Sequence, residues 1–307
     1  MIMQERSAQE GPAKRIDRRG FLAAVGGAAG FALAGPLAAS RLVGGPGGSR
    51  SGPAAPGPVP LEPVGLQLYT VRSLMERDVP RTLQRVADVG YREVEFAGYY
   101  DHEPERLRGI LDRLGLSAPS AHVSLETMEG DGAASAIRAA QALGHRWLVV
   151  PWLPPEQRQT LDDYRRVAAS LEEIGARVND AGLRLAYHNH DFELEPIDGT
   201  LPYTILADTE PDRVALQLDL YWVRAAGSDA LTWFRRHPGR FPSVHVKDMA
   251  TDGEMVDVGS GVIDWADVLG KARAAGVEHL FVEHDQPGDD PIASVRNSFQ
   301  YLHRLPV

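Results

Sequence analysis

From residue 64 onward, short apolar runs alternate with longer helix-like stretches, and this rhythm limits the fold more than any other feature. The runs are continuous and partly β-branched, as expected of parallel strands buried on both faces. Predicted strands cover residues 64–69, 92–97, 118–123, 146–150, 183–188, 213–219, 242–247 and 279–284. Predicted helices cover residues 79–89, 103–114, 133–143, 160–181, 200–208, 228–236, 264–275 and 290–304.

Glycine closes most of these helices just before the next strand, as a helix C-cap does. The glycines concerned are Gly90, Gly115, Gly144, Gly182 and Gly276. Eight strand–helix pairs in about 250 residues match the size of a (β/α)8 TIM barrel. An open doubly wound sheet is the alternative, but it normally carries a Gly-rich phosphate loop after its first strand, and none follows Leu68. We therefore expect a (β/α)8 barrel over residues 61–307.

Residues 1–43 read as a targeting segment. Arg18 and Arg19 form a twin-arginine pattern, and an apolar Gly/Ala-rich stretch with small residues suited to cleavage follows. A membrane anchor is the alternative, although the glycines and Pro36 make this stretch a poor spanning helix. Residues 44–60 form a Gly/Pro linker. The sequence thus predicts export by the twin-arginine route to a periplasmic or extracellular location, with no stable membrane anchor after cleavage.

Composition excludes several kinds of site. The 307-residue chain has no cysteine, so it has no disulfide, zinc–thiolate site or cysteine nucleophile. Its formal net charge of −10 argues against a nucleic-acid partner, because phosphate backbones bind basic surfaces.

Four consecutive predicted strands end in residues that bind metals: His188, Asp219, His245 and Glu283. The carboxyl ends of barrel strands converge on one mouth, so these side chains should meet there. Taken singly, such a histidine is often structural and such an aspartate often caps a helix. Together they predict a site for one divalent metal. Two imidazoles and two carboxylates suit Mn, Co, Zn, Fe or Ni better than Ca, and Mg less well than these five.

The chain resembles the xylose isomerase-like barrel superfamily, the sugar phosphate isomerase/epimerase group, over residues 64–305. The matching strings lie at 65–72, 90–95, 187–193 (YHNHDFE), 218–223, 238–240, 245–248 (HVKD), 258–265 (VGSGVIDW) and 282–285 (VEHD). Order and spacing of these strings are typical of the superfamily and do not specify a substrate.

The resemblance implies one metal held by acids and a histidine from strands 5 to 8. Asp219, His245 and Glu283 fall on three of the positions, and His188 stands at the fourth, where glutamate is usual. Trp222 replaces the histidine of the usual Asp-x-x-His pair. A pair of glutamates that transfers protons, one on each face of the sugar, is therefore not evident. Glu193, farther along the loop that follows His188, is a candidate substitute for the strand-5 glutamate.

The mechanism implied is proton removal next to a carbonyl, with a metal-stabilised enediolate. Reprotonation gives isomerisation or epimerisation, and loss of a β-substituent gives dehydration or another lyase reaction. Candidate catalytic groups are Glu283, Lys247 and His188, with pKa values expected to move toward neutrality through burial and the metal. Lys247 could instead form a salt bridge with Asp248. Candidate substrate contacts are His122, His190, Trp152, Trp222, Tyr69 and Arg72, although core packing is a common fate for such aromatic rings.

The sequence thus predicts an exported, metal-dependent sugar isomerase or epimerase, and superfamily members often form homo-oligomers. Its substrate is expected to be a non-phosphorylated sugar or keto-sugar, since no cluster of Arg and Lys is evident. The glycines at 258–261 could approach a ligand, but a plain turn with Asp264 as a helix cap is preferred. A keto-sugar dehydratase or lyase and a non-catalytic sugar-binding protein are alternatives. A phosphodiesterase of the abasic-site nuclease type would need more ligands and basic surface.

Overall fold

The computed structural model describes residues 63–305 as a closed barrel of eight parallel strands, with neighbours in chain order and the last strand pairing with the first. The strands are β1 (Val64–Gln67), β2 (Glu93–Phe96), β3 (Ser117–His122), β4 (Trp147–Val150), β5 (Arg184–His188), β6 (Val214–Asp219), β7 (Ser243–Val246) and β10 (His279–Val282). The predicted barrel is confirmed. The predicted targeting segment (1–43) and linker (44–60) lie outside the described residues.

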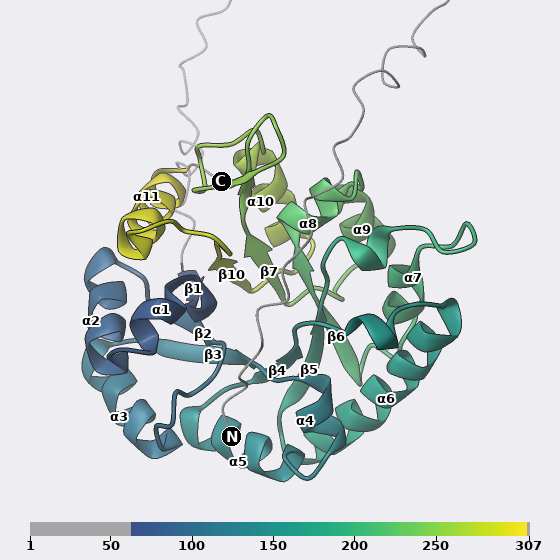
Figure 1. Cartoon of the computed structure of the whole chain (residues 1–307), viewed down its shortest axis with the longest axis horizontal. Helices are drawn as coiled ribbons and strands as arrows, with labels where there is room; N and C mark the ends of the chain where they lie inside the picture. The colour runs from purple at the N-terminus through teal and green to yellow at the C-terminus, as the bar shows by residue number, and fades with distance from the viewer. Residues whose placement is uncertain (1–62, 306–307) are drawn as a thin grey trace, which may run out of the picture. The chain divides into compact units, whose positions relative to one another are not determined.

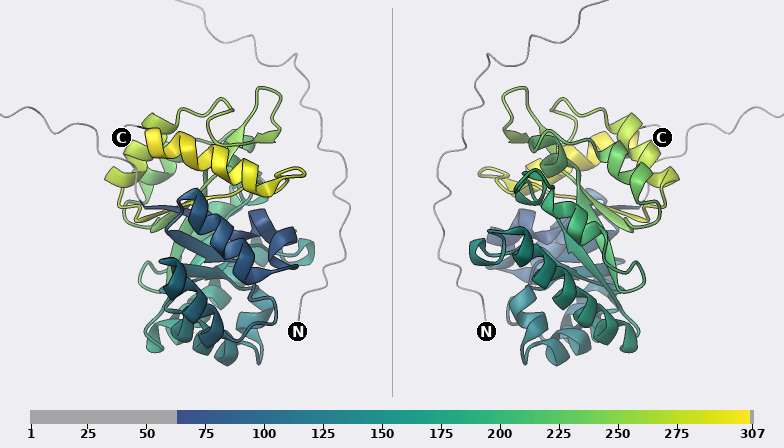
Figure 2. Two further views of the ribbon diagram at one scale, coloured as in Figure 1. Left: turned by 90° about the vertical axis from the view of Figure 1, so that its left-hand side faces the viewer. Right: turned by 90° about the vertical axis from the view of Figure 1, so that its right-hand side faces the viewer.

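Helices surround the strands, as Figure 1 shows. The eight predicted helices are present as α2 (Val79–Val89), α3 (Pro104–Leu114), α5 (Ala133–Leu143), α6 (Leu161–Asp180), α7 (Pro202–Ala207), α9 (Ala230–Arg236), α10 (Trp265–Ala274) and α11 (Pro291–Arg304). The longest, α6, starts with a capping box in which Thr160 and Asp163 satisfy each other's backbone N–H groups. Figure 2 shows α11 returning to the first helices, and its Phe299 ring lies 4.9 Å from that of Tyr91.

Several short elements after the strands escaped the sequence prediction. They are η1 (Leu68–Val71), α1 (Arg72–Met75), α4 (Leu125–Glu129), η2 (Pro155–Gln157), η3 (Phe192–Leu194), α8 (Leu220–Ala225) and a hairpin of β8 (Asp248–Met249) and β9 (Met255–Val256). Most are single turns, too short for a periodic signal. Among residues 63–305, no helix is long and apolar enough to cross a membrane.

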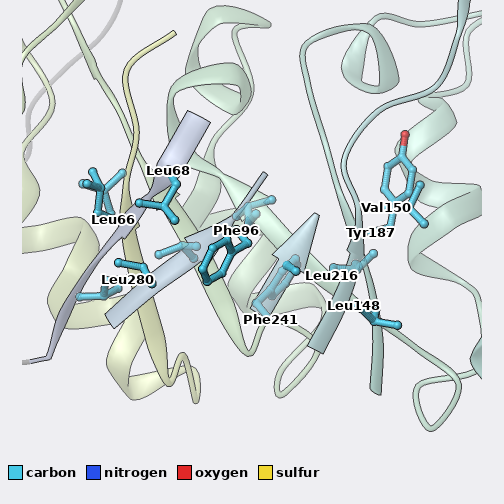
Figure 3. Packing of buried hydrophobic residues seen from close by; sticks show 14 of the residues in the cluster. Leu66, Leu68, Phe96, Leu148, Val150, Tyr187, Leu216, Phe241 and Leu280 are labelled. Atoms are coloured by element: carbon cyan, nitrogen blue, oxygen red, sulfur yellow. The ribbon is translucent and has the colours of Figure 1, made fainter. Parts of the chain in front are cut away.

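Strand residues alternate between two environments. Leu148, Val150 and Tyr187 belong to the main core between strands and helices, part of which Figure 3 shows. Their neighbours along the strands, Trp147 and Val149 of β4, instead form a separate small cluster with Ala186 and Ala215. This two-residue period is that of a barrel strand with one face outward and one inward. Toward the carboxyl ends the inward positions become polar and remain buried; they are Gln67, Glu95, Ser120, His188, Gln217, Asp219 and His245.

The buried carboxylate of Asp248 holds the long loop after β7 in place. It accepts hydrogen bonds from the backbone N–H groups of Gly259 (2.8 Å) and Gly261 (3.1 Å) and from the indole N–H of Trp265 (2.9 Å). The 258–261 turn thus binds the carboxylate of Asp248 and not a ligand anion. Asp264 caps α10, so the structure agrees with the turn-and-cap interpretation.

We expect Gly261→Ala to lower the free energy of unfolding by about 2–4 kcal/mol, in the range of overpacking and lost buried hydrogen bonds. A Cβ at Gly261 would lie 2.2 Å from Asp248 Oδ1 and 2.4 Å from the Met249 carbonyl oxygen. The matched control is Gly270→Ala in α10, where a Cβ meets no atom within 4 Å and should stabilise the helix slightly. Urea unfolding of both variants measures the difference; equal stabilities would contradict this role of the turn.

Candidate metal centre

The four predicted ligands come together at the carboxyl ends of β5, β6, β7 and β10. His188, Asp219, His245 and Glu283 each offer one ligand atom, and these atoms all lie within 4.8 Å of one another. All four residues are buried. The register explains the meeting, because His188 pairs with Gln217 two residues before Asp219, and Asp219 pairs with His245.

The two carboxylate oxygens of Asp219 have different roles. Oδ1 accepts a hydrogen bond from the Trp222 backbone N–H (2.9 Å) and so caps α8. Oδ2 is buried and accepts no well-oriented hydrogen bond, although the Lys247 ammonium lies 3.1 Å away. Capping and metal binding are therefore compatible, since a different oxygen is available for each.

His245 lies between two carboxylates. Its Nδ1 is 2.7 Å from Glu283 Oε2, and its Nε2 is 2.7 Å from Glu95 Oε1. Burial alone would lower the pKa of His245, but the two carboxylates raise it to about 10. A metal-binding histidine usually has its other ring nitrogen held by a carboxylate. Glu95 provides this contact, and Nδ1 then faces the ligand group.

The side-chain amide of Gln217 orients the His188 ring. Its Nδ1 lies 3.1 Å from Gln217 Oε1, and its Nε2 lies 3.7 Å from Asp219 Oδ2. Burial lowers its pKa well below the usual value, and the nearby His245, His190 and Lys247 lower it further. The ring is therefore neutral, as a metal ligand must be.

Lys247, just after β7, is buried among three carboxylates. Its Nζ lies 2.7 Å from Glu283 Oε2 and 3.1 Å from both Asp219 Oδ2 and Asp285 Oδ1. The alternative for Lys247, a salt bridge to Asp248, is not formed, because that carboxylate binds the 258–261 turn.

The pKa values of Lys247 and Glu283 also differ from the sequence expectation. Burial would lower the pKa of Lys247, yet the surrounding carboxylates raise it well above the usual value. Burial would raise the pKa of Glu283, yet Lys247 and His245 lower it far below the usual range. Neither group moves toward neutrality: Lys247 is an ammonium and Glu283 a carboxylate.

This arrangement fits a divalent cation. Glu95, Asp219, Glu283 and Asp285 carry four negative charges, against one on the Lys247 ammonium and one on a protonated His245. The excess of negative charge is two, and it becomes three when His245 loses the Nδ1 proton that it must give up to bind a metal. Such buried excess charge is costly unless a cation compensates it. The unbonded Asp219 Oδ2 and the imidazoles supply oxygen and nitrogen donors of the kind that first-row transition metals prefer.

Three of the predicted substrate contacts surround the ligand group. His122 Nε2 lies 3.0 Å from Gln217 Oε1 and 3.1 Å from Glu95 Oε1. The His190 ring stacks on Phe192 (5.6 Å) and lies 5.4 Å from the tilted ring of Trp222, and its Nδ1 has no hydrogen-bond partner among the described residues. Trp222 lies 5.7 Å from the Lys247 ammonium.

The other three lie farther out. Tyr69 and Trp152 are 40% and 39% exposed, and each ring lies near a guanidinium, that of Arg72 (4.0 Å) for Tyr69 and that of Arg158 (5.3 Å) for Trp152. The Arg72 guanidinium donates hydrogen bonds to the carbonyl oxygens of Tyr69 and Asp285, 2.8 Å each. Arg72 therefore connects the loops after β1 and β10.

Glu193, the proposed substitute for a strand-5 glutamate, does not belong to the ligand group. Its carboxylate accepts hydrogen bonds from the Tyr187 hydroxyl and from the His190 backbone N–H (2.8 Å). Burial raises its pKa to about 7, although these two donors oppose the shift.

The sequence places Gln67 and Glu95 at strand ends near the metal site without giving them a role, and Ser120 and Gln217 were missed. Glu95 accepts hydrogen bonds from Gln67 Nε2 (2.8 Å), Ser120 Oγ (2.6 Å) and Gln217 Nε2 (2.8 Å). The sequence held a signal for two of these residues. Glu95 and Gln217 are polar residues in apolar runs, at positions whose side chains face the barrel interior, and Gln217 stands two residues before Asp219.

The chain is similar to a known protein family and to several sugar-converting proteins. Residues 83–305 match the family described as Xylose isomerase-like TIM barrel. An inosose dehydratase from Lacticaseibacillus casei is 25% identical over 256 residues, covering 69% of this chain and 82% of that protein. A crystal structure of a sugar phosphate isomerase/epimerase from Parabacteroides distasonis is 26% identical with a TM-score of 0.70, over 82% of this chain and 96% of that one. A 3-keto-D-glucoside 4-epimerase from E. coli, 17% identical, shares the fold with a TM-score of 0.61 over 78% of this chain and 98% of that one.

Glu193 should make stability depend on pH. Its folded-state pKa of about 7 lies above the ordinary 4.5, so its stabilising contribution is complete below about pH 4.5 and is lost as pH rises through 7. Glu193→Gln mimics the protonated acid and should remove this loss, on the order of 2–3 kcal/mol. Melting temperatures of both proteins from pH 5 to 8 test this: the variant's advantage should grow with pH, and parallel curves would contradict it.

Proposed function

The chain belongs to the xylose isomerase-like TIM barrel family, and from its site we propose that it is a divalent-metal-dependent enzyme that enolises a non-phosphorylated keto-sugar or cyclic polyol ketone. The observation that carries this proposal is the convergence of His188, Asp219, His245 and Glu283 within 4.8 Å beside the Lys247 ammonium. Mn, Co, Zn, Fe or Ni is the proposed metal.

These four residues would hold the metal, which supplies Lewis-acid polarisation of the substrate carbonyl when bound. Glu283 accepts the proton from the carbon next to the carbonyl, since its carboxylate is ionised. The Lys247 ammonium donates a hydrogen bond and then a proton to an oxygen of the substrate. Because Lys247 Nζ lies 2.7 Å from Glu283 Oε2, the proton can pass back from acid to amine and restore both groups.

Dehydration is the outcome that this arrangement supports best. The α C–H bond breaks to Glu283, the β C–O bond breaks, and the departing hydroxide takes a proton from Lys247 to leave as water. Acid and base then lie on one side of the site, as the observed Glu283–Lys247 contact allows. An inosose dehydratase among the relatives supports the same outcome.

Isomerisation or epimerisation is the second candidate, because it shares the enolisation step and differs only in where the proton returns. An epimerase that inverts a centre needs a second base on the opposite face. His188 stands where that base is usual, and its Nδ1 is engaged by Gln217. His190, with a ring nitrogen lacking a partner among residues 63–305, is the remaining candidate on that side.

The basic residues limit the substrate. No cluster of Arg and Lys that would bind a phosphate is evident in the sequence, so we propose a neutral ketone with neighbouring hydroxyls. His122, His190, Trp222, Trp152 and Tyr69 are the proposed walls. Export by residues 1–43 and homo-oligomerisation also remain proposals.

Metal content is the first test. Purified protein loaded with Mn or Co should retain about one ion per chain, and Asp219→Asn and Glu283→Gln should lose it, because each removes a charged ligand. The exposed Asp289→Asn is the matched control and should keep its metal. Elemental analysis after dialysis measures this, and full retention in both site variants would exclude the proposed centre.

Turnover in deuterium oxide separates the steps. The wild-type protein should eliminate water from a responsive keto-sugar and exchange its α-proton with solvent. Lys247→Met should keep exchange but slow elimination by about 10²–10⁴-fold, the usual range for a general acid. Glu283→Gln should lose both. Saturable sugar binding without exchange in the wild-type protein would instead indicate a binding protein.

A further inference from the structure

We propose that Gln217 is a positioning residue that holds His188 with its ring proton on Nδ1, so that Nε2 is presented to the metal. This inference rests on the metal centre of the proposed function and adds a residue that contacts neither metal nor substrate. Gln217 is fully buried on the inward face of β6, below the ligand group.

The orientation of the Gln217 amide is determined from its far side. Its Nε2 lies 2.8 Å from Glu95 Oε2 and 3.0 Å from Ser243 Oγ. An ionised carboxylate only accepts hydrogen bonds, so the amide nitrogen must face Glu95. A flipped amide would bring two acceptor oxygens together in the barrel interior, and burial makes such a contact costly. Oε1 therefore faces the histidines.

The amide in turn determines the His188 tautomer. Oε1 of Gln217 can only accept, so the His188 Nδ1 that lies 3.1 Å away must carry the hydrogen. The same oxygen lies 3.0 Å from His122 Nε2, which donates in the same way. With its hydrogen on Nδ1, the imidazole of His188 offers an unshared electron pair on Nε2.

That electron pair faces the ligand group. His188 Nε2 lies 3.7 Å from Asp219 Oδ2, too far for a hydrogen bond, and that oxygen has no well-oriented donor among the described residues. Two acceptors at this separation are each available to a cation. The other tautomer would place a hydrogen on Nε2 and block the nitrogen.

A side chain below the ligand group also holds one ring nitrogen of His245, but here it is Nε2 and not Nδ1. Glu95 lies 2.7 Å from its Nε2, so its Nδ1 is the nitrogen that faces Glu283. Glu95 and Gln217 are themselves hydrogen-bonded, so one connected pair of side chains orients both imidazoles. Contacts of this kind typically contribute 10–100-fold to metal affinity.

The decisive measurement is the tautomer in metal-free protein. Protein labelled with ¹⁵N-histidine gives two-bond ¹H–¹⁵N correlations that distinguish the two tautomers, and His188→Gln assigns the peaks. The wild-type protein should show His188 protonated on Nδ1. Gln217→Met, which removes the acceptor but keeps the length, should give a mixture or the Nε2–H form. Gln300→Met, at an exposed position of α11, is the matched control and should leave the spectrum unchanged.

Cobalt titration provides the second readout. Gln217→Met should bind Co²⁺ 10–100-fold more weakly than wild type, and Gln300→Met equally well. His188 protonated on Nε2 in the wild-type protein overturns the proposal even if Gln217→Met does not fold. Unchanged tautomer or unchanged cobalt affinity in a folded Gln217→Met also overturns it. Since neither readout uses substrate, a protein that passes both tests but turns over no keto-sugar refutes only the proposed function.

Discussion

The site depends on one buried carboxylate. Glu95 accepts hydrogen bonds from Gln67, Ser120, Gln217 and His245, and His122 lies 3.1 Å away, so five side chains from four other strands meet at its two oxygens. Burial alone would raise its pKa, but His122 and His245 lower it well below the usual value. An ionised group in a barrel interior persists only when it is fully hydrogen-bonded, and this one is. Its orientation then determines those of Gln217 and His245, and Gln217 determines that of His188.

Above this carboxylate lies an arrangement with more negative than positive charge. The Lys247 ammonium contacts Asp219, Glu283 and Asp285, and it alone does not balance them. A divalent cation would compensate this excess of negative charge. The Glu283–Lys247 contact also provides an acid next to a base, which is what loss of water from a keto-sugar requires.

The sequence predicted the barrel because each strand and each long helix carries its own periodic signal, and Gly90 and Gly115 mark where helices end. It also predicted the ligand group, because parallel strands bring their carboxyl ends together whatever the loops do. The partners of Lys247 and the second role of Asp219 could not be predicted, since both depend on side-chain directions in space. Gln217 interrupts an apolar run two residues before Asp219, but its partners become visible only once β6 is placed between β5 and β7.

We propose that His188 and His245 bind one metal together with Asp219 and Glu283, through nitrogens selected by the Glu95–Gln217 pair. Anomalous diffraction from zinc-loaded crystals tests it most directly. We expect a single peak about 2.0–2.2 Å from His188 Nε2, His245 Nδ1 and one oxygen each of Asp219 and Glu283. A peak coordinated by His188 Nδ1 or His245 Nε2, or no peak between these four side chains, would contradict it.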